Sequence, residues 1–213
     1  MNPIASFAHF FKAGGPYMYA ILAVGVVILA FVAERFFVIG RTAAFNAGKF
    51  TNDVVSRLAK GDVNGAAEMC RRTKHPVAQV AHAVISRADS DEERMQVAAD
   101  GAAMVALPPL SRRLPYLNML ANVSTLLGLL GTIFGLITAF SAVDAADPSQ
   151  RSAFLARGIS EALNTTAFGL IVAVPTLLLH GFLVSKVEAV VEAVDQASVR
   201  VIDALSRRSA RAA

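Results

Sequence analysis

The sequence predicts an all-α membrane protein with three transmembrane helices and long cytoplasmic helical extensions. Of its 213 residues, 55% are hydrophobic and 17% are charged, and the mean hydropathy is +0.53. A soluble domain of this length seldom has so apolar a composition. Three apolar runs, at residues 17–39, 117–140 and 159–184, are each long enough to cross a bilayer as a helix.

The first expected element is a short segment, residues 1–16, at the periplasmic surface of the membrane. Its aromatic side chains can lie in the interface, and Gly14-Gly15-Pro16 ends it. These aromatic residues are Phe7, Phe10 and Phe11.

The first transmembrane helix is expected at residues 17–39. This run is too long, and the residues before it are too weakly basic, for a cleavable signal peptide, so we expect the helix to be retained. Glu34 and Arg35 stand near its end. We expect both at the membrane interface, where a long side chain can reach water.

Residues 40–116 turn polar and are expected to form a cytoplasmic helical region. Three short helices are predicted at residues 51–59, 63–72 and 76–88. A fourth is predicted to begin at Ser90, because Ser90 and Glu93 have the spacing of a capping box, and to run toward Leu107. Prolines at 108, 109 and 115 are expected to kink or divide the path into the next span.

The second transmembrane helix is expected at residues 117–140, which carry no charge. The 23 residues 118–140 would extend about 35 Å as a helix. Small and hydroxyl-bearing residues recur in this run at steps of three and four, which places them on one helix face. They are Thr125, Gly128, Thr132, Gly135 and Ala139.

A short periplasmic loop, residues 141–158, is expected before the third transmembrane helix at 159–184 and a cytoplasmic C-terminal helix at 185–213. The third span repeats the small-residue pattern of the second. Its face consists of Ala162, Thr166, Gly169, Ala173 and Thr176. Such stripes serve close helix packing as well as they would serve an ion path, so both interpretations stay open at this point.

The distribution of basic residues predicts the orientation. Lys and Arg number 11 in residues 41–116 and 5 in 185–213, against 1 in 1–16 and 2 in 141–158. The positive-inside rule therefore places the N-terminus in the periplasm and the C-terminus in the cytoplasm. It also accounts for the net charge of +4 without nucleic acid as a partner.

The spans lack the groups that would carry a charge through a membrane. None has an acidic or basic residue in its middle, and Glu161 stands at the threshold of the third, one turn before Thr165. Taken alone, Glu161 is equally explained as an acidic residue that the helix dipole favours at a helix N-terminus. A hydroxyl can pass a hydrogen bond but cannot hold a proton at an accessible pKa. If this protein moves protons, a partner would therefore have to bring the mid-membrane carboxylate. We find no enzyme motif, and neither the single Cys70 nor His75 and His82 make a metal site.

Two blocks carry a resemblance to a known family. GLLGTIFGLITAF in the second span and GISEALNTTAFGLIVAVPTLLLHG in the third resemble the MotA/TolQ/ExbB proton-channel family. The order of the spans, the cytoplasmic insertion of about 75 residues and the pair Glu34-Arg35 are similar to its ExbB/TolQ-like branch. The family also includes gliding-motor homologues.

The resemblance implies a ring. Five copies would surround two copies of a single-span partner like ExbD, TolR or MotB, whose helix carries the proton-accepting Asp. Thr132 and Thr166 would line the pore, with Glu161 and Thr165 on the proton pathway. The implied packing and kink positions are Gly128, Gly135, Gly169, Ala173 and Pro175.

The implied function is a stator-like proton-channel subunit of the bacterial inner membrane, which converts proton motive force into mechanical work. That work would be TonB-type or Tol-type energisation, or gliding motility. Protons serve as the coupling ion, no cofactor is implied, and membrane lipids surround the ring. The alternative is a non-conducting membrane scaffold that recruits cytoplasmic or envelope partners.

Overall fold

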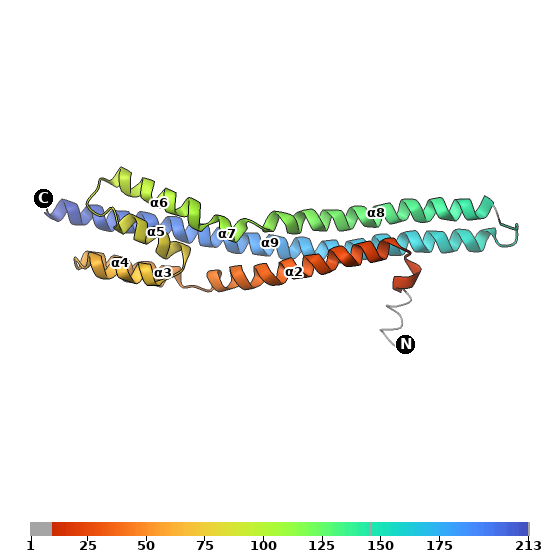
Figure 1. The fold of residues 1–213 in the computed structure, drawn as a ribbon, viewed down its shortest axis with the longest axis horizontal. Helices are drawn as coiled ribbons and strands as arrows, with labels where there is room; N and C mark the ends of the chain where they lie inside the picture. The colour runs from red at the N-terminus through yellow and green to blue at the C-terminus, as the bar shows by residue number, and fades with distance from the viewer. Residues whose placement is uncertain (1–9, 145, 213) are drawn as a thin grey trace. The chain divides into compact units, whose positions relative to one another are not determined.

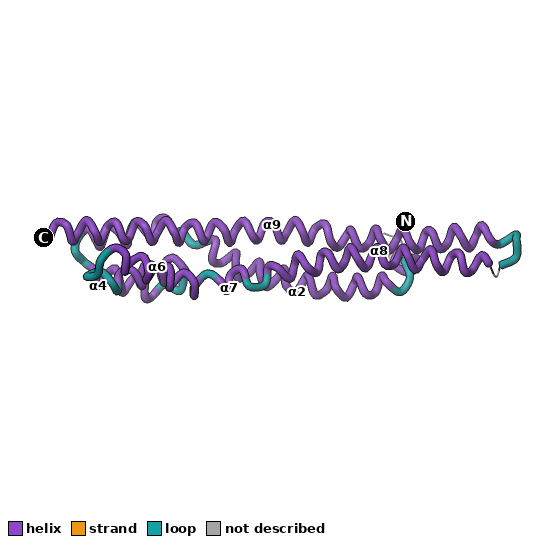
Figure 2. Tube along the Cα trace, turned by 90° about the horizontal axis from the view of Figure 1, so that it is seen from above, coloured by secondary structure: helices purple, strands orange, loops and turns teal. Residues whose placement is uncertain are grey.

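The computed structural model describes residues 10–144 and 146–212, and within this part of the chain every regular element is a helix (Figures 1 and 2). Three helices are long and apolar enough to cross a membrane, which confirms the predicted fold class. The helices are α2 Tyr17–Ala43, α3 Ala47–Ala59, α4 Val63–Arg72, α5 Pro76–Ile85, α6 Glu92–Ala106, α7 Pro108–Ser111, α8 Leu114–Asp144 and α9 Arg151–Ala212.

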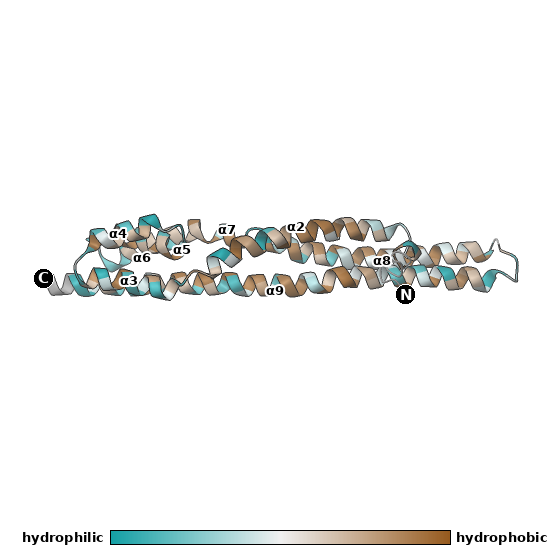
Figure 3. Cartoon of the chain, turned by 90° about the horizontal axis from the view of Figure 1, so that it is seen from below, coloured by the Kyte–Doolittle hydropathy of each residue, from teal (hydrophilic) through white to brown (hydrophobic). Residues whose placement is uncertain are grey.

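The chain forms two compact units, to which α2 and α9 both contribute. The span unit comprises the described residues up to Glu34 together with Arg113–Gly181. The extension unit comprises Arg35–Arg112 and the chain from Phe182 onward. Apolar residues follow one another along α2, α8 and the first half of α9, while α3, α4 and α6 are more polar (Figure 3).

In the span unit, α8 and the first half of α9 form an antiparallel pair (Figure 1). Gly135 lies against Ala162, and Gly158, closer to the start of α9, lies against Ala139. The connection between these helices is shorter than the loop expected at residues 141–158, because α8 continues to Asp144 and α9 begins at Arg151. Small residues along both helix ends let the pair continue beyond the apolar run.

Residues 10–16 pack within the span unit. Residues 10–13 are helical, and Phe10 and Phe11 make edge-to-face contacts with Phe168 of α9. Met18 and Ile21 of α2 are fully buried in the same cluster. Phe10 and Phe11 are half-buried against Phe168, and their expected place at the membrane surface stays a prediction. Phe7 lies outside the described residues.

The extension unit has an aliphatic core between α3–α6 and the C-terminal half of α9. Its helix starts carry side-chain caps: Asn46 accepts from the Lys49 amide, and Asp62 accepts from the Gly65 amide. The predicted Ser90 cap is wrong, since Asp91 accepts from the Arg94 amide and α6 begins one residue later. The fully buried members of the core include Val54, Leu58, Ala66, Val77, Ala78, Val84, Val201 and Leu205.

The pair Glu34-Arg35 is held by protein groups. Glu34 forms an ion pair with Arg113 in the span unit. Arg35 is only 5% exposed, and its Nη1 donates to the Pro109 carbonyl at 3.1 Å in the extension unit. That carbonyl lies in the short helix α7, whose last carbonyls lack partners within the helix. Arg35 therefore satisfies a helix end and does not extend toward water as expected.

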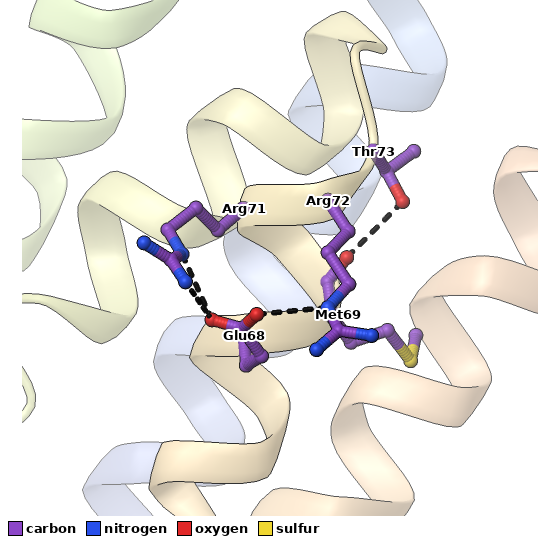
Figure 4. A network of polar contacts seen from close by, with 5 residues as sticks. All are labelled: Glu68, Met69, Arg71, Arg72 and Thr73. Atoms are coloured by element: carbon purple, nitrogen blue, oxygen red, sulfur yellow. Dashed lines mark hydrogen bonds and ion pairs between the residues drawn. The ribbon is translucent and has the colours of Figure 1, made fainter.

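The surface of α4 carries a small charge network (Figure 4). Glu68 binds Arg72 at 2.8 Å and Arg71 at 2.7 Å, one turn away on the same helix. Hydrogen bonds from Arg72 and then Arg71 hold the pKa of the Glu68 carboxyl below its usual value. Beside them, the Thr73 hydroxyl donates to the Met69 carbonyl at 3.1 Å and so ends α4. Because these charges are solvent-exposed, the network fixes the positions of the three side chains but adds little to the stability of the fold.

Candidate functional site

The candidate site is the seam between α8 and α9 in the span unit, where two glycines bring the backbones together. A Cβ placed on Gly128 would lie 3.2 Å from the Cα of Thr166, and one on Gly169 would lie 2.8 Å from the Ser124 carbonyl oxygen. A methyl group at Gly169 would force the two backbones apart, and one at Gly128 would need its neighbours to move by a few tenths of an ångström. Close approach through small residues is how membrane helices associate when lipid removes the hydrophobic driving force.

Small residues do form the buried face of α8, but two of the residues in the seam differ from those predicted. Gly128, Gly135 and Ala139 are buried as predicted, whereas Thr125 is exposed and Thr132 is half-buried. Ser124 and Gly131, one residue earlier in each case, occupy the seam instead. Thr132 therefore lies at the edge of the α8–α9 contact, with part of its side chain open.

In the third span, too, one buried residue is the neighbour of the one predicted. Ala162, Gly169, Ala173 and Thr176 are buried as predicted, but Thr165 takes the buried place that the pattern gave to Thr166. Thr165 is 1% exposed and lies against Gly131, where a Cβ would collide with its side chain. Thr166 is half-buried and borders the seam, as Thr132 does on α8.

The two bordering threonines use their hydroxyl groups differently. The Thr132 hydroxyl donates to the Leu129 carbonyl of its own helix at 2.5 Å. The Thr166 hydroxyl donates across the seam to the Gly128 carbonyl at 2.9 Å. Each donation leaves the oxygen lone pairs able to accept a hydrogen bond from water or from another helix. The site thus offers hydroxyl oxygens at the margin of an apolar contact.

Thr165 and Glu161 meet the start of the chain. The Thr165 hydroxyl lies 2.6 Å from the Gly14 carbonyl oxygen and 2.8 Å from the Glu161 carbonyl oxygen. The Glu161 carboxylate lies against Gly15, so closely that a Cβ there would overlap it. Sequence reasoning missed this contact of the Gly14–Gly15 turn. The positive φ of Gly15, 71°, requires glycine, but its partner 146 residues later leaves no local pattern.

Pro175 lies inside α9, which the structure describes as one helix from Arg151 to Ala212. Proline removes a backbone donor from the helix ladder. Its side chain is exposed on the unit, while Ala173 and Thr176 on either side are buried. The Thr176 hydroxyl donates to the Val172 carbonyl at 2.7 Å, within the turn that Pro175 interrupts. The stretch that Pro175 interrupts thus has its proline on the exposed face and buried side chains on the opposite face.

The charge content limits what this site can do alone. Residues 117–140 contain no Asp, Glu, Lys or Arg, and residues 159–184 contain Glu161 alone. Within the described part of the chain, no cluster of three His, Cys, Asp or Glu side chains could hold a metal ion. The hydroxyl groups can orient water and accept hydrogen bonds, but they cannot hold a proton at an accessible pKa as a carboxyl group can.

Fold and site together define a three-span helical membrane protein whose spans pack through glycine and carry hydroxyl groups at their margin. Residues 72–196 match the MotA/TolQ/ExbB proton channel family, and the chain belongs to it, in the ExbB/TolQ-like branch. The matched residues include the two sequence blocks that carry the resemblance, at 128–140 and 158–181, and most of the seam.

Individual relatives support the same family assignment. The chain is 29% identical over 167 residues to a Synechocystis sp. protein named as the ExbB-like 3 biopolymer transport protein, covering 78% of this chain and 79% of that one. It is 23% identical over 200 residues to a Methanothermobacter thermautotrophicus ExbB homolog, covering 92% and 70%. Over 81 residues it is 38% identical to the Tol-Pal system protein TolQ of Haemophilus influenzae, covering 38% and 35%.

Proposed function

We propose that this chain is the proton-channel subunit of a motor in the bacterial inner membrane, working with a single-span partner of the ExbD or TolR kind. The proposal rests on the combination of polar groups that the spans contain. They present hydroxyl oxygens beside a tight seam, yet they contain no mid-membrane acid. The partner helix supplies the carboxylate, and Thr132 and Thr166 line its path.

The proposed mechanism alternates the charge on the partner's carboxylate. Protons approach from the periplasmic side near Glu161 and Thr165, and protonation removes the cost of exposing the carboxylate to an apolar helix face. The partner then turns against its ring, and the proton leaves toward the cytoplasm. A membrane potential of 100 mV supplies about 2.3 kcal/mol per charge, which is enough to bias competing helix packings.

The proposed assembly is a ring of five copies around two copies of the partner, with the N-terminus in the periplasm and the C-terminus in the cytoplasm. The basic residues of 41–116 and 185–213 support this orientation. The extension units would form a cytoplasmic collar, and the tight Gly128–Gly169 seam would keep each copy rigid while the partner moves.

The work we propose is energisation of transport across the envelope, in keeping with the biopolymer-transport and Tol-Pal names of the relatives. Tol-type envelope maintenance and gliding motility would use the same machinery. Deleting the gene separates them: loss of energised uptake fits the first, a leaky outer membrane the second, and loss of surface movement the third.

The experiment is reconstitution of the chain in vesicles with its single-span partner under an imposed pH gradient and potential. We expect proton uptake in sodium-free buffer that disappears when the partner's mid-membrane Asp is replaced by Asn. Uptake that depends on sodium would reassign the coupling ion. A complex that assembles but takes up no protons with the intact Asp would favour the non-conducting scaffold.

A further inference from the structure

We infer that residues 10–16, here called the N-terminal cap, control access to the Glu161 carboxyl group, and that Gly15 and Thr165 are the residues that position this cap. The inference rests on the proposed role of Glu161 at the outer end of the ion path. All the contacts that carry it lie within the span unit.

The first contact is a hydrogen bond between segments far apart in sequence. The buried Thr165 hydroxyl lies 2.6 Å from the Gly14 carbonyl oxygen, although the two residues are 151 positions apart. A threonine in an apolar helix ordinarily donates to its own helix, here to the Glu161 carbonyl at 2.8 Å. Since a hydroxyl has one proton, the two acceptors share it. The bond to Gly14 ties the cap to α9 one turn from Glu161.

The second contact places the cap on the carboxylate itself. Gly15 has φ +71°, in the region that favours glycine, and its Cα faces the Glu161 carboxylate. Any side chain at residue 15 would overlap that carboxylate. The turn therefore closes against Glu161 only because residue 15 is glycine. By this contact Gly15 limits both the positions open to the carboxylate and the space for water beside it.

Aromatic and helical contacts hold the cap on both sides of the turn. Phe10 and Phe11 lie edge to face against Phe168, with ring centroids 6.5 and 5.7 Å away. After the turn, the Met18 amide donates to the Gly15 carbonyl at 3.3 Å, and the Met18 side chain is fully buried. The cap is thus a packed element, and an ion that reaches Glu161 from this side has to displace it.

The test measures access to Glu161 directly, with dicyclohexylcarbodiimide as the probe and the full chain in native membranes. This reagent adds to a protonated carboxyl group and leaves a stable N-acylurea, which peptide mass spectrometry locates. We expect Thr165→Val, which keeps the shape of the side chain but removes the donor, to speed labelling of Glu161 about fivefold, the equivalent of one hydrogen bond. Thr165→Ser keeps the donor and should label at the wild-type rate.

Gly15 gives an independent variant with a matched control. Gly15→Ala should also speed labelling, because the added methyl group cannot share the space of the carboxylate. Gly25→Ala is the control, since a Cβ there would lie 3.6 Å from Val172, an ordinary contact. Wild-type labelling rates in both Thr165→Val and Gly15→Ala would overturn the inference. Equal acceleration in Thr165→Val and Thr165→Ser would overturn the part played by the hydroxyl.

Hydrogen exchange tests the cap in the wild-type chain, without a variant that has to fold. We expect the amides of Met18 and Tyr19 to be as protected as those in the middle of α2, because they bond to Gly15 and Pro16 in a packed cap. Free exchange at these two amides would contradict a closed cap. Faster labelling in Thr165→Val with unchanged proton flux would keep the cap and reject Glu161 as part of the ion path.

Discussion

The two units of this protein are both helical, yet different side chains hold them together. In the extension unit, Val54, Leu58 and Val77 are completely buried in an aliphatic core, as in a water-soluble domain. In the span unit, the α8–α9 contact is made by Gly128, Gly169 and their small neighbours. Burying large apolar side chains stabilises a helix bundle only where water is the alternative. In lipid, close approach and hydrogen bonds take that role.

The largest loss of stability is expected when a buried side chain of the extension-unit core is shortened. Leu58 is 0% exposed, so Leu58→Ala should destabilise the unit by about 3 kcal/mol through lost burial and a cavity. Hydrogen exchange of α3 and α5 should accelerate while exchange in α8 stays at the wild-type rate. The solvent-facing Ser56→Ala is the control. A variant that loosens both units equally would contradict their separate stabilisation.

In the span unit, adding a methyl group to the seam should lower the stability of the helix pair. Gly169→Ala adds one methyl group 2.8 Å from the Ser124 carbonyl oxygen, so α8 and α9 have to separate at a cost of about 2 kcal/mol. Gly181→Ala is the matched control in the same helix, because nothing lies within 4 Å of its added methyl group. Thermal unfolding in detergent should show a lower midpoint for Gly169→Ala alone. An unchanged midpoint would mean that the seam is not tight.

The sequence was sufficient to predict the spans, most of the extension helices and the small-residue faces, because these follow from periodicity and composition. It did not determine which of two adjacent faces is buried. Thr125 and Thr132 were expected in the seam, where Ser124 and Gly131 lie. A helix that is apolar all round has no polar face to fix its rotation, so neighbouring small residues compete equally well.

Long-range contacts were also beyond prediction. The Gly14–Thr165 hydrogen bond and the Arg35–Pro109 hydrogen bond join positions 151 and 74 residues apart. Each depends on where two helices meet, which no local pattern encodes. The Ser90 cap failed for a smaller reason: Asp91 is an equally good cap residue, and the backbone selected it.

A smaller effect is expected from pH in the extension unit. The His75 ring is buried, its Nδ1 accepts from the Val77 amide, and its Nε2 lies 3.2 Å from the Thr42 carbonyl oxygen. Burial lowers the pKa of His75, although the Thr42 carbonyl opposes this, so the folded unit favours the neutral ring. Its stabilising contribution is therefore present above about pH 6.5, the unfolded value, and is lost as the pH falls below it.

The measurement for His75 is the unfolding midpoint between pH 7.5 and 5. We expect the wild-type midpoint to fall as the pH falls through this range, and to fall less in His75→Asn, which can still cap α5 but does not titrate. An identical pH dependence in wild type and His75→Asn would contradict the assignment.

The smallest expected effect is at Cys70, which is 1% exposed in the core of the extension unit. Burial raises the pKa of its thiol to about 11, so little thiolate forms at neutral pH. Iodoacetamide at pH 8 should leave Cys70 unmodified in the folded protein and modify it fully after denaturation. Rapid modification of the folded chain would contradict a closed aliphatic core around Cys70.

We propose that the hydroxyl groups of Thr132 and Thr166, at the border of the seam, line the path of a proton to the partner's carboxylate and do more than pack the helices together. The most direct measurement is proton flux through the reconstituted complex carrying Thr132→Ala and Thr166→Ala together. We expect an assembled complex with flux at background. The control Thr138→Ala changes an exposed α8 threonine that bonds to its own helix, and it should conduct normally. Wild-type flux in the double variant would contradict the claim.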